Sequence, residues 1–286
     1  MKHIAFIGFG EAGQALAPAG ARAYDLLSDA PATRAAKHAD YAAAGVTGCA
    51  DARAALSDAA AAFCLVTADQ AVSAAQGCAP LLAPGALWLD MNSVAPDTKR
   101  TAALAIEASG GRYVDIAVMA PVLPARRAVP LLVAGPHAEA ALDLLRQIGF
   151  SNVQPAGAAI GDASAIKMIR SVMVKGIEAL SAECILAAHR AGVADAVLAS
   201  LDASWTERSW AARIDYNLDR MLAHGLRRAA EMAEVATTLG ALGIDPAMTR
   251  ATIARQQAIG ALGIAPPEGL SAKLAAIDPE RKDQAA

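Results

Sequence analysis

The sequence is poor in cysteine, in histidine and in aromatic residues. Its four cysteines, Cys49, Cys64, Cys78 and Cys184, are widely spaced, and no C-x-x-C pattern occurs. The five histidines form no cluster with the spacing of metal ligands. These absences argue against a disulfide-stapled fold and against a metal site. They favour a soluble protein of the reducing cytoplasm.

Long hydrophobic runs and an excess of one charge are also missing. No stretch approaches the roughly 18 uncharged, strongly apolar residues of a membrane-spanning helix, and the apolar run at the N-terminus is too short for a signal peptide. Membrane association is therefore not expected. Lys and Arg number 25 against 28 Asp and Glu, which gives a net charge of −3. Without a broad basic surface, nucleic acid is not expected as a partner either.

The chain of 286 residues falls into two parts that differ in the pattern of their apolar residues. In the first part, apolar runs at 4–7, 62–67, 86–90, 113–119 and 131–134 alternate with alanine-rich segments of helical spacing, which predicts a parallel sheet covered on both faces. After about residue 157 the strand-like runs stop, and a long helix is predicted from 162 to about 191. Further helices are predicted at 194–201, 208–239 and 246–259. The charged, proline-containing stretch 265–286 is predicted to be a loose tail.

A glycine-rich turn follows the first predicted strand. Its sequence is G-x-G-x-x-G, formed by Gly8, Phe9, Gly10, Glu11, Ala12 and Gly13. Such a turn after a strand and before a helix binds the diphosphate of a dinucleotide, because the glycines permit a tight turn and close backbone approach. Alone the pattern could be a flexible turn, but its place at the start of a β-α-β sequence favours the dinucleotide.

An acidic residue is expected after the second strand, where it would bind ribose hydroxyls. Asp25 is the candidate, 17 residues after Gly8, and this short spacing implies a short first helix. A 2′-phosphate would meet the negative charge of Asp25, so the sequence favours NAD over NADP. Arg22 and Arg34 lie near in sequence, which keeps NADP open.

Several segments together resemble the β-hydroxyacid dehydrogenase superfamily, in detail a bacterial branch similar to 6-phosphogluconate dehydrogenase. They are the glycine-rich turn, DMNSVAP at 90–96, VDIAVM at 114–119 and GDASAIK at 161–167. The resemblance covers about residues 1–260. It implies a Rossmann-type NAD(P)-binding domain over 1–157 and an all-helical substrate and dimerisation domain over 158–286. A homodimer through the helical domain is expected, with a small substrate held between the domains.

The resemblance also implies roles for particular residues. Lys167 corresponds to the general acid/base on the hydroxyl that becomes a carbonyl; the alternative is that it belongs to a polar helix stripe facing water. The residues implied near the substrate are Asn92, Ser93, Met119 and Ser171. Those implied near the cofactor, besides the turn and Asp25, are Val66, Thr67 and Asn92. Asn92 and Ser93 could instead cap the following helix.

Two departures from the family keep other functions open. Ser171 stands where the family has asparagine, and Met119 stands where it has the serine of a Ser-Gly-Gly segment. The main expectation is hydride transfer between nicotinamide and a small, polar, hydroxy-acid-like substrate. The alternatives are an imine-reductase-like enzyme, because Met119-Ala120-Pro121 is similar to that family, and a non-catalytic NAD(P)-binding sensor. Arg227 and Arg228 could form an anion pocket or a solvated helix face.

Overall fold

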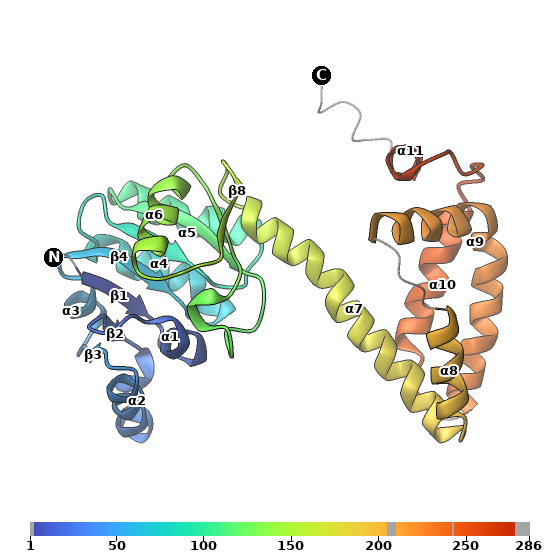
Figure 1. The fold of residues 1–286 in the computed structure, drawn as a ribbon, viewed down its shortest axis with the longest axis horizontal. Coiled ribbons are helices and arrows are strands. Elements are labelled where there is room, and N and C mark those ends of the chain that lie inside the picture. Colours follow the sequence, from blue (N-terminus) through green and yellow to red (C-terminus); the bar gives the residue numbers. More distant parts are fainter. Residues whose placement is uncertain (1–2, 205–209, 242, 278–286) are drawn as a thin grey trace. The chain divides into compact units, whose positions relative to one another are not determined.

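The computed structural model describes residues 3–204, 210–241 and 243–277. The chain divides into two compact units, Met1–Val172 and Met173–Ala286, drawn in Figure 1. The long helix α7 (Asp162–Arg190) begins in the first unit and ends in the second.

An eight-stranded sheet forms the centre of the first unit. Its order is β3-β2-β1-β4-β5-β6-β7-β8, and neighbouring strands are parallel except for the antiparallel pair of β6 and β7. The strand bounds are β1 (His3–Ile7), β2 (Arg22–Tyr24), β3 (Thr47–Gly48), β4 (Ala59–Cys64), β5 (Leu87–Asp90), β6 (Arg112–Val118), β7 (Leu131–Ala134) and β8 (Val153–Gly157). Strand order reverses direction at β1, where open α/β sheets bind ligands at the carboxyl edge.

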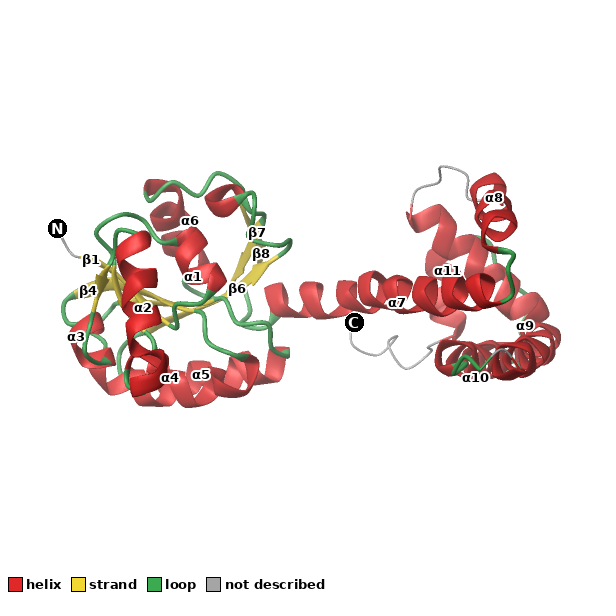
Figure 2. Ribbon diagram, turned by 90° about the horizontal axis from the view of Figure 1, so that it is seen from below, coloured by secondary structure: helices red, strands yellow, loops and turns green. Residues whose placement is uncertain are grey.

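Helices cover both faces of this sheet (Figure 2). One face packs against α1 (Glu11–Leu16), α2 (Pro31–Ala43) and α6 (Ala138–Gln147), and the other against α3 (Ala52–Leu56), α4 (Ala71–Cys78) and α5 (Pro96–Ala108). All four phenylalanines pack on the first face, where the rings of Phe6 and Phe63 stack at 4.7 Å, whereas Trp88 and Tyr113 pack on the second. Because both faces are covered, the inner strands are almost continuously apolar.

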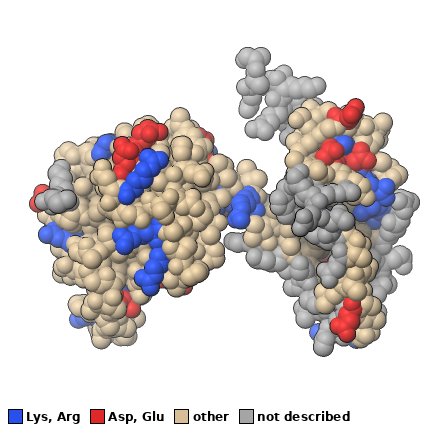
Figure 3. Space-filling view, in the orientation of Figure 1, with Lys and Arg blue, Asp and Glu red and all other residues tan. Residues whose placement is uncertain are grey.

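Short 3₁₀ turns complete the first unit. They are η1 (Leu26–Ser28), η2 (Ala68–Gln70), η3 (Ala79–Leu81) and η4 (Arg126–Ala128). On the face drawn in Figure 3, basic and acidic groups are scattered among a larger area of other residues.

The described part of the second unit is helical. After α7 come α8 (Ala194–Ser204), α9 (Trp210–Ala241), α10 (Ala247–Gly260) and α11 (Leu270–Ile277). Helices α9 and α10 cross closely at two glycines: a Cβ added to Gly225 would lie only 2.8 Å from the Cα of Gly260. Glu183 of α7 caps α10 by accepting hydrogen bonds from the backbone N–H groups of Met248 (2.8 Å) and Thr249 (3.0 Å).

The predicted fold class, a Rossmann-type α/β domain followed by a helical region, is confirmed. The prediction of a loose tail from residue 265 is wrong for 270–277, which form α11. This helix is held because the buried Lys273 pairs with Asp215 (2.9 Å) and Asp219 (3.4 Å) of α9. The compact units meet at 172/173, whereas the functional division at 157/158 stays a prediction.

Candidate functional site

The glycine-rich turn joins β1 to α1. Gly8 has a φ of +81°, and a Cβ there would lie 2.6 Å from the carbonyl oxygen of Leu65. At Gly13 a Cβ would lie 3.0 Å from the ring of Phe9. At Gly10, by contrast, a Cβ would meet nothing within 4 Å. Gly8 is thus required by its backbone conformation and packing, a side chain at Gly13 would be crowded, and Gly10 borders open space, as expected where a ligand approaches the backbone.

Two side chains hold the Phe9 peptide within this turn. The Phe9 N–H donates to Asp25 Oδ2 at 2.7 Å, and the buried Lys37 ammonium donates to the Phe9 carbonyl at 2.9 Å. The other oxygen of Asp25 accepts a hydrogen bond from Leu27 N at 2.9 Å. Asp25 therefore links the turn to the end of β2, and the orientation of the turn is fixed before any ligand binds.

The two nearby arginines are engaged by backbone carbonyls. Arg34 donates to the carbonyls of Ser28 (2.9 Å) and Asp29 (2.7 Å), and Arg22 approaches the carbonyl of Ser57 at 3.4 Å. Both guanidinium groups thus donate to backbone carbonyls. Of Arg22, Asp25 and Arg34, it is therefore Asp25 that contacts the turn.

Other residues predicted near the cofactor also lie beside the turn or at the same sheet edge. A Cβ on Gly8 would meet Val66 Cγ1 at 3.0 Å, so Val66 lies directly against the turn. Thr67 is exposed and precedes η2. Glu11 is exposed and Ala12 half-buried in the first turn of α1. The structure thus brings these residues together at the carboxyl ends of β1 and β4.

Lys167 and Ser93 meet although they are 74 residues apart. Lys167 lies in the second turn of α7, and its Nζ donates to Ser93 Oγ at 2.7 Å. Ser93 is exposed and follows β5, whose carboxyl end lies at the same edge as that of β1 because the strands are parallel. A cationic amine and a hydroxyl are thus paired at the sheet edge where open α/β folds bind ligands.

The remaining predicted substrate residues belong to the segments that carry this pair or pack against them. Asn92 is buried, and its Nδ2 donates to Cys64 Sγ at 3.2 Å. The Ser171 hydroxyl donates to the Lys167 carbonyl at 2.8 Å, within α7. Met119 follows β6 and packs in a small apolar cluster with Ala163 in the first turn of α7.

Sequence reasoning missed a buried ionic group at this edge, which we call the Lys99 cluster: Asp90, Lys99, Tyr113 and Asp115. The three charged side chains are fully buried, and Lys99 Nζ lies 3.0 Å from Asp90 Oδ1 and 3.5 Å from Asp115 Oδ1. Burial, followed by the charge of Asp90, raises the pKa of Tyr113 well above its usual range. Tyr113 therefore stays protonated and donates to Asp90 Oδ2 at 2.6 Å. The only sequence signal was charge inside otherwise apolar strands.

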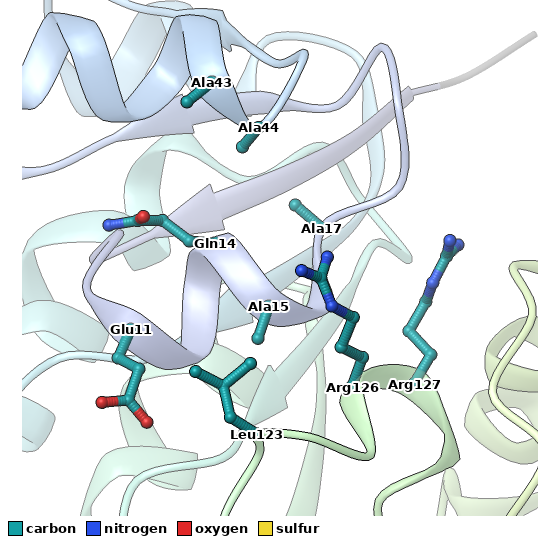
Figure 4. A pocket seen from close by; sticks show the side chains of 9 residues that line it. All are labelled: Glu11, Gln14, Ala15, Ala17, Ala43, Ala44, Leu123, Arg126 and Arg127. Carbon is teal, nitrogen blue, oxygen red and sulfur yellow. The ribbon is translucent and has the colours of Figure 1, made fainter.

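A separate hollow of about 330 Å³ runs along α1 (Figure 4). Its lining comes from α1, from the end of α2 and from the segment at 123–127, and Figure 4 shows Arg126 reaching toward α1. Lys167 and Ser93 do not line it. Among the described residues, no group of three or more His, Cys, Asp or Glu side chains is arranged to hold a metal ion. None of the helices in the described ranges has the length and apolar character needed to cross a membrane.

Fold and site together define a class: a Rossmann-type NAD(P)-binding protein with a helical C-terminal region. The model for the NAD-binding domain of 6-phosphogluconate dehydrogenase matches residues 3–155, just over half of the chain. The chain therefore belongs to this family, and its fold is like that of the NAD(P)-binding hydroxyacid dehydrogenases. A domain of unknown function, DUF1932, matches residues 188–259.

Solved structures agree with this assignment. A conserved hypothetical protein from Sinorhizobium meliloti is 38% identical, with 97% of this chain and 96% of that chain covered and a TM-score of 0.61. The conserved protein MTH1747, described as structurally similar to 3-hydroxyacid dehydrogenases, is 31% identical, with 90% and 96% covered and a TM-score of 0.57. An imine reductase from Pseudomonas sp. shares the fold at 16% identity, with 96% and 99% covered and a TM-score of 0.72.

A curated relative gives no further activity. It is an uncharacterized 28.5 kDa protein of Methanothermus fervidus, 25% identical over 169 residues, or 58% of this chain. The matched region spans 63% of the length of that relative.

Proposed function

We propose that the protein is an NAD(P)-dependent oxidoreductase that transfers hydride between nicotinamide and a small, polar, hydroxy-acid-like substrate. The observation that carries this proposal is the contact of Lys167 Nζ with Ser93 Oγ, at 2.7 Å, at the sheet edge that also carries the glycine-rich turn. The contact supports the proposal because an amine that can transfer a proton and a hydroxyl that can orient a substrate lie at the same sheet edge as the glycine-rich turn.

In the oxidative direction the substrate loses a hydride from carbon and a proton from its hydroxyl, and a carbonyl forms. The bound nicotinamide supplies the hydride acceptor. Lys167 in its neutral form takes the hydroxyl proton at Nζ, and as an ammonium it returns that proton in the reverse direction. Ser93 orients the amine. Its hydroxyl can donate a hydrogen bond to the substrate oxygen or accept one from the substrate hydroxyl. Positioned proton transfer of this kind typically contributes 10²–10⁴-fold in rate.

The residues of the turn fit a dinucleotide, and we propose that NAD is preferred over NADP. The open space above Gly10 leaves room for a diphosphate near the backbone. Asp25 is held beside the turn by Phe9 N and Leu27 N, and its remaining lone pairs can accept from ribose hydroxyls. A 2′-phosphate would meet this carboxylate, while Arg34 is engaged by backbone carbonyls.

Titration with NADH and NADPH, followed by nicotinamide fluorescence, tests the cofactor assignment first. A panel of hydroxy acids, alcohols and cyclic imines then tests turnover, with Lys167→Ala as the decisive variant. We expect Lys167→Ala to bind NADH normally and to lose at least about 10²-fold in turnover. Arg170→Ala, which removes an exposed cation from the same helix, is the matched control and should keep full activity. Binding of NADH or NADPH without turnover of any compound in the panel would favour the alternative that the protein is a non-catalytic NAD(P)-binding sensor.

Imine reduction is the second candidate, and one observation favours it. Met119 lies where the family has a serine, and it is half-buried in an apolar cluster with Ala117, Ala134 and Ala163. Such a surface offers no hydroxyl to a substrate carboxylate and suits a less polar substrate. NADPH-dependent turnover of cyclic imines that survives Lys167→Ala would replace the hydroxy-acid proposal.

We also propose that the protein is a cytoplasmic homodimer joined through the helical unit. This unit leaves large apolar side chains exposed along α7, α8 and α9, among them Met173, Leu180, Leu198 and Leu226. A contiguous apolar patch is typical of an interface, and we propose that these side chains form one. All four cysteines are free, as suits a reducing compartment. Sedimentation at micromolar concentration should give twice the chain mass of 29.0 kDa, and a monomer would refute the dimer.

A further inference from the structure

The Lys99 cluster contacts both segments that carry the Lys167–Ser93 pair. On the side of α7, Asp115 Oδ2 accepts three hydrogen bonds from the start of the helix. They come from Gly161 N (3.1 Å), Ser164 N (3.0 Å) and Ser164 Oγ (3.1 Å). Lys167 lies three residues after Ser164, so the helical turn that carries it begins at the Asp115 carboxylate.

On the side of β5, Asp90 holds the segment that leads to Ser93. Asp90 Oδ1 accepts a hydrogen bond from Asn92 N at 2.9 Å, and Lys99 Nζ donates to the Asp90 carbonyl at 2.6 Å. Ser93 is the next residue after Asn92. The direction in which the chain leaves β5 is therefore fixed one residue before the hydroxyl that contacts Lys167.

Lys99 joins these two sides. Asp90 and Asp115 are direct register partners on the adjacent strands β5 and β6, so their two carboxylates lie close together away from water. Without a cation between them, two ionised carboxylates at this spacing would repel each other strongly. Lys99 Nζ lies between them, with a hydrogen bond to Asp90 and an ion pair to Asp115. The ammonium is thus the link between the Ser93 segment and the first turn of α7.

We propose that Lys99 and Asp115 are positioning residues that set the Lys167–Ser93 contact, an inference that rests on the proposed acid/base role of Lys167. Buried ion pairs contribute little net stability compared with apolar packing, whereas they can specify one arrangement. Here the arrangement they specify is the distance between an amine on α7 and a hydroxyl after β5. Neither residue touches the substrate: both act through the backbone of the two segments.

Asp115→Asn is the sharpest perturbation, because the side chain keeps its size and loses one acceptor. The single amide oxygen can face either α7 or Lys99, and the amide NH₂ must then face donors on the other side. Either orientation breaks one half of the link. Ser164→Ala is the milder second variant, because it removes one of the three hydrogen bonds to Asp115 and leaves every charge in place.

Competitive acetylation of the purified full chain measures the effect without any substrate. Trace acetic anhydride is applied across a pH series, and mass spectrometry of the peptide that contains Lys167 gives the pH midpoint of its reaction. Ser93→Ala defines the midpoint of a Lys167 amine from which the Ser93 hydroxyl has been removed. Glu107→Gln is the matched control, because Glu107 lies on α5 like Lys99 and accepts a hydrogen bond from β6, at Tyr113 N (2.8 Å).

We expect the Lys167 midpoint of Asp115→Asn to move toward that of Ser93→Ala by at least half of the difference between Ser93→Ala and wild type. Ser164→Ala should move it in the same direction by less, and Glu107→Gln should leave it unchanged even if it lowers the melting temperature. Folded Asp115→Asn and Ser164→Ala proteins with a wild-type midpoint would overturn the proposal. If Asp115→Asn does not fold, Ser164→Ala alone decides. A Ser93→Ala midpoint equal to wild type would also overturn it.

The outcome is separate from that of the proposed function. A shifted midpoint in a protein that binds no dinucleotide would leave the positioning role standing and refute the oxidoreductase. Turnover that depends on Lys167, together with an unshifted midpoint, would do the reverse.

Discussion

Replacing Gly10 by alanine separates cofactor binding from folding at the glycine-rich turn. Gly10 precedes α1 with φ −83° and ψ −154°, an extended conformation that alanine also adopts. The added Cβ would meet nothing within 4 Å in the protein. Gly8→Ala differs on both counts, because its φ is +81° and its Cβ would lie 2.6 Å from a backbone oxygen.

The magnitudes follow from this geometry. Gly10→Ala should leave the free energy of unfolding within about 0.5 kcal/mol of wild type, as for other unstrained surface changes. Gly8→Ala carries about 1–2 kcal/mol for the left-handed conformation alone, before the backbone clash is added. If a diphosphate lies against Gly10, the methyl group overpacks that contact at a cost of about 1–3 kcal/mol. This cost corresponds to a loss of NADH affinity of roughly 5- to 150-fold.

Fluorescence titration with NADH and urea unfolding of the same preparations give both quantities. Gly77→Ala is the matched control, since Gly77 lies in α4 and a Cβ added there would meet nothing within 4 Å. It should bind NADH as wild type does. A Gly10→Ala protein with wild-type NADH affinity would refute the placement of the diphosphate at this turn.

Three further changes test other contacts. Asp25→Ala should weaken NADH binding by about tenfold or more, the equivalent of one hydrogen bond to a charged group. In parallel titrations the ratio of the affinity for NADH to the affinity for NADPH should fall. Lys37→Met removes the donor to the Phe9 carbonyl and should lower stability by about 1–3 kcal/mol in urea unfolding. Burial acts to raise the pKa of Glu183, but hydrogen bonds from Thr249 and Met248 outweigh it and hold the pKa below its ordinary value near 4.5. This stabilisation is present above pH 4.5 and is lost as the pH falls, so Glu183→Gln should show a flatter decline of melting temperature in acid. An identical acid profile would show that the cap does not titrate as described.

Local pattern was enough to predict the fold class. The run from Ile4 to Ile7 followed by Gly8 places a strand before a tight turn, and both periodicity and spacing are local properties. Strand β2 was expected only as the strand before Asp25, and β3 was not predicted, because they have only three and two residues, Arg22–Tyr24 and Thr47–Gly48. Their pairing depends on the neighbouring strand rather than on their own composition.

The site was predictable only as far as its segments are recognisable. The meeting of Lys167 with Ser93 depends on how β5 and α7 are packed, and no spacing in the sequence encodes that distance. The Lys99 cluster was hidden for the same reason: Asp90 and Asp115 become neighbours only through the register of β5 and β6. A single charged residue in an apolar strand indicates that a charge is buried there, but it does not identify the residue that pairs with it.

The alanine-rich composition of the chain explains why polar contacts, rather than apolar packing, fix the positions of the segments around the site. The core of the first unit is rich in alanine, and alanine surfaces interlock less specifically than large side chains, so packing alone defines helix positions loosely. The buried charged side chains described in this unit are Lys37, Asp90, Lys99 and Asp115. All four act on the site: Lys37 holds the glycine-rich turn, and the other three hold the segments that carry Ser93 and Lys167. Directional hydrogen bonds thus fix the parts of the molecule where a displacement of one ångström would matter for the proposed proton transfer.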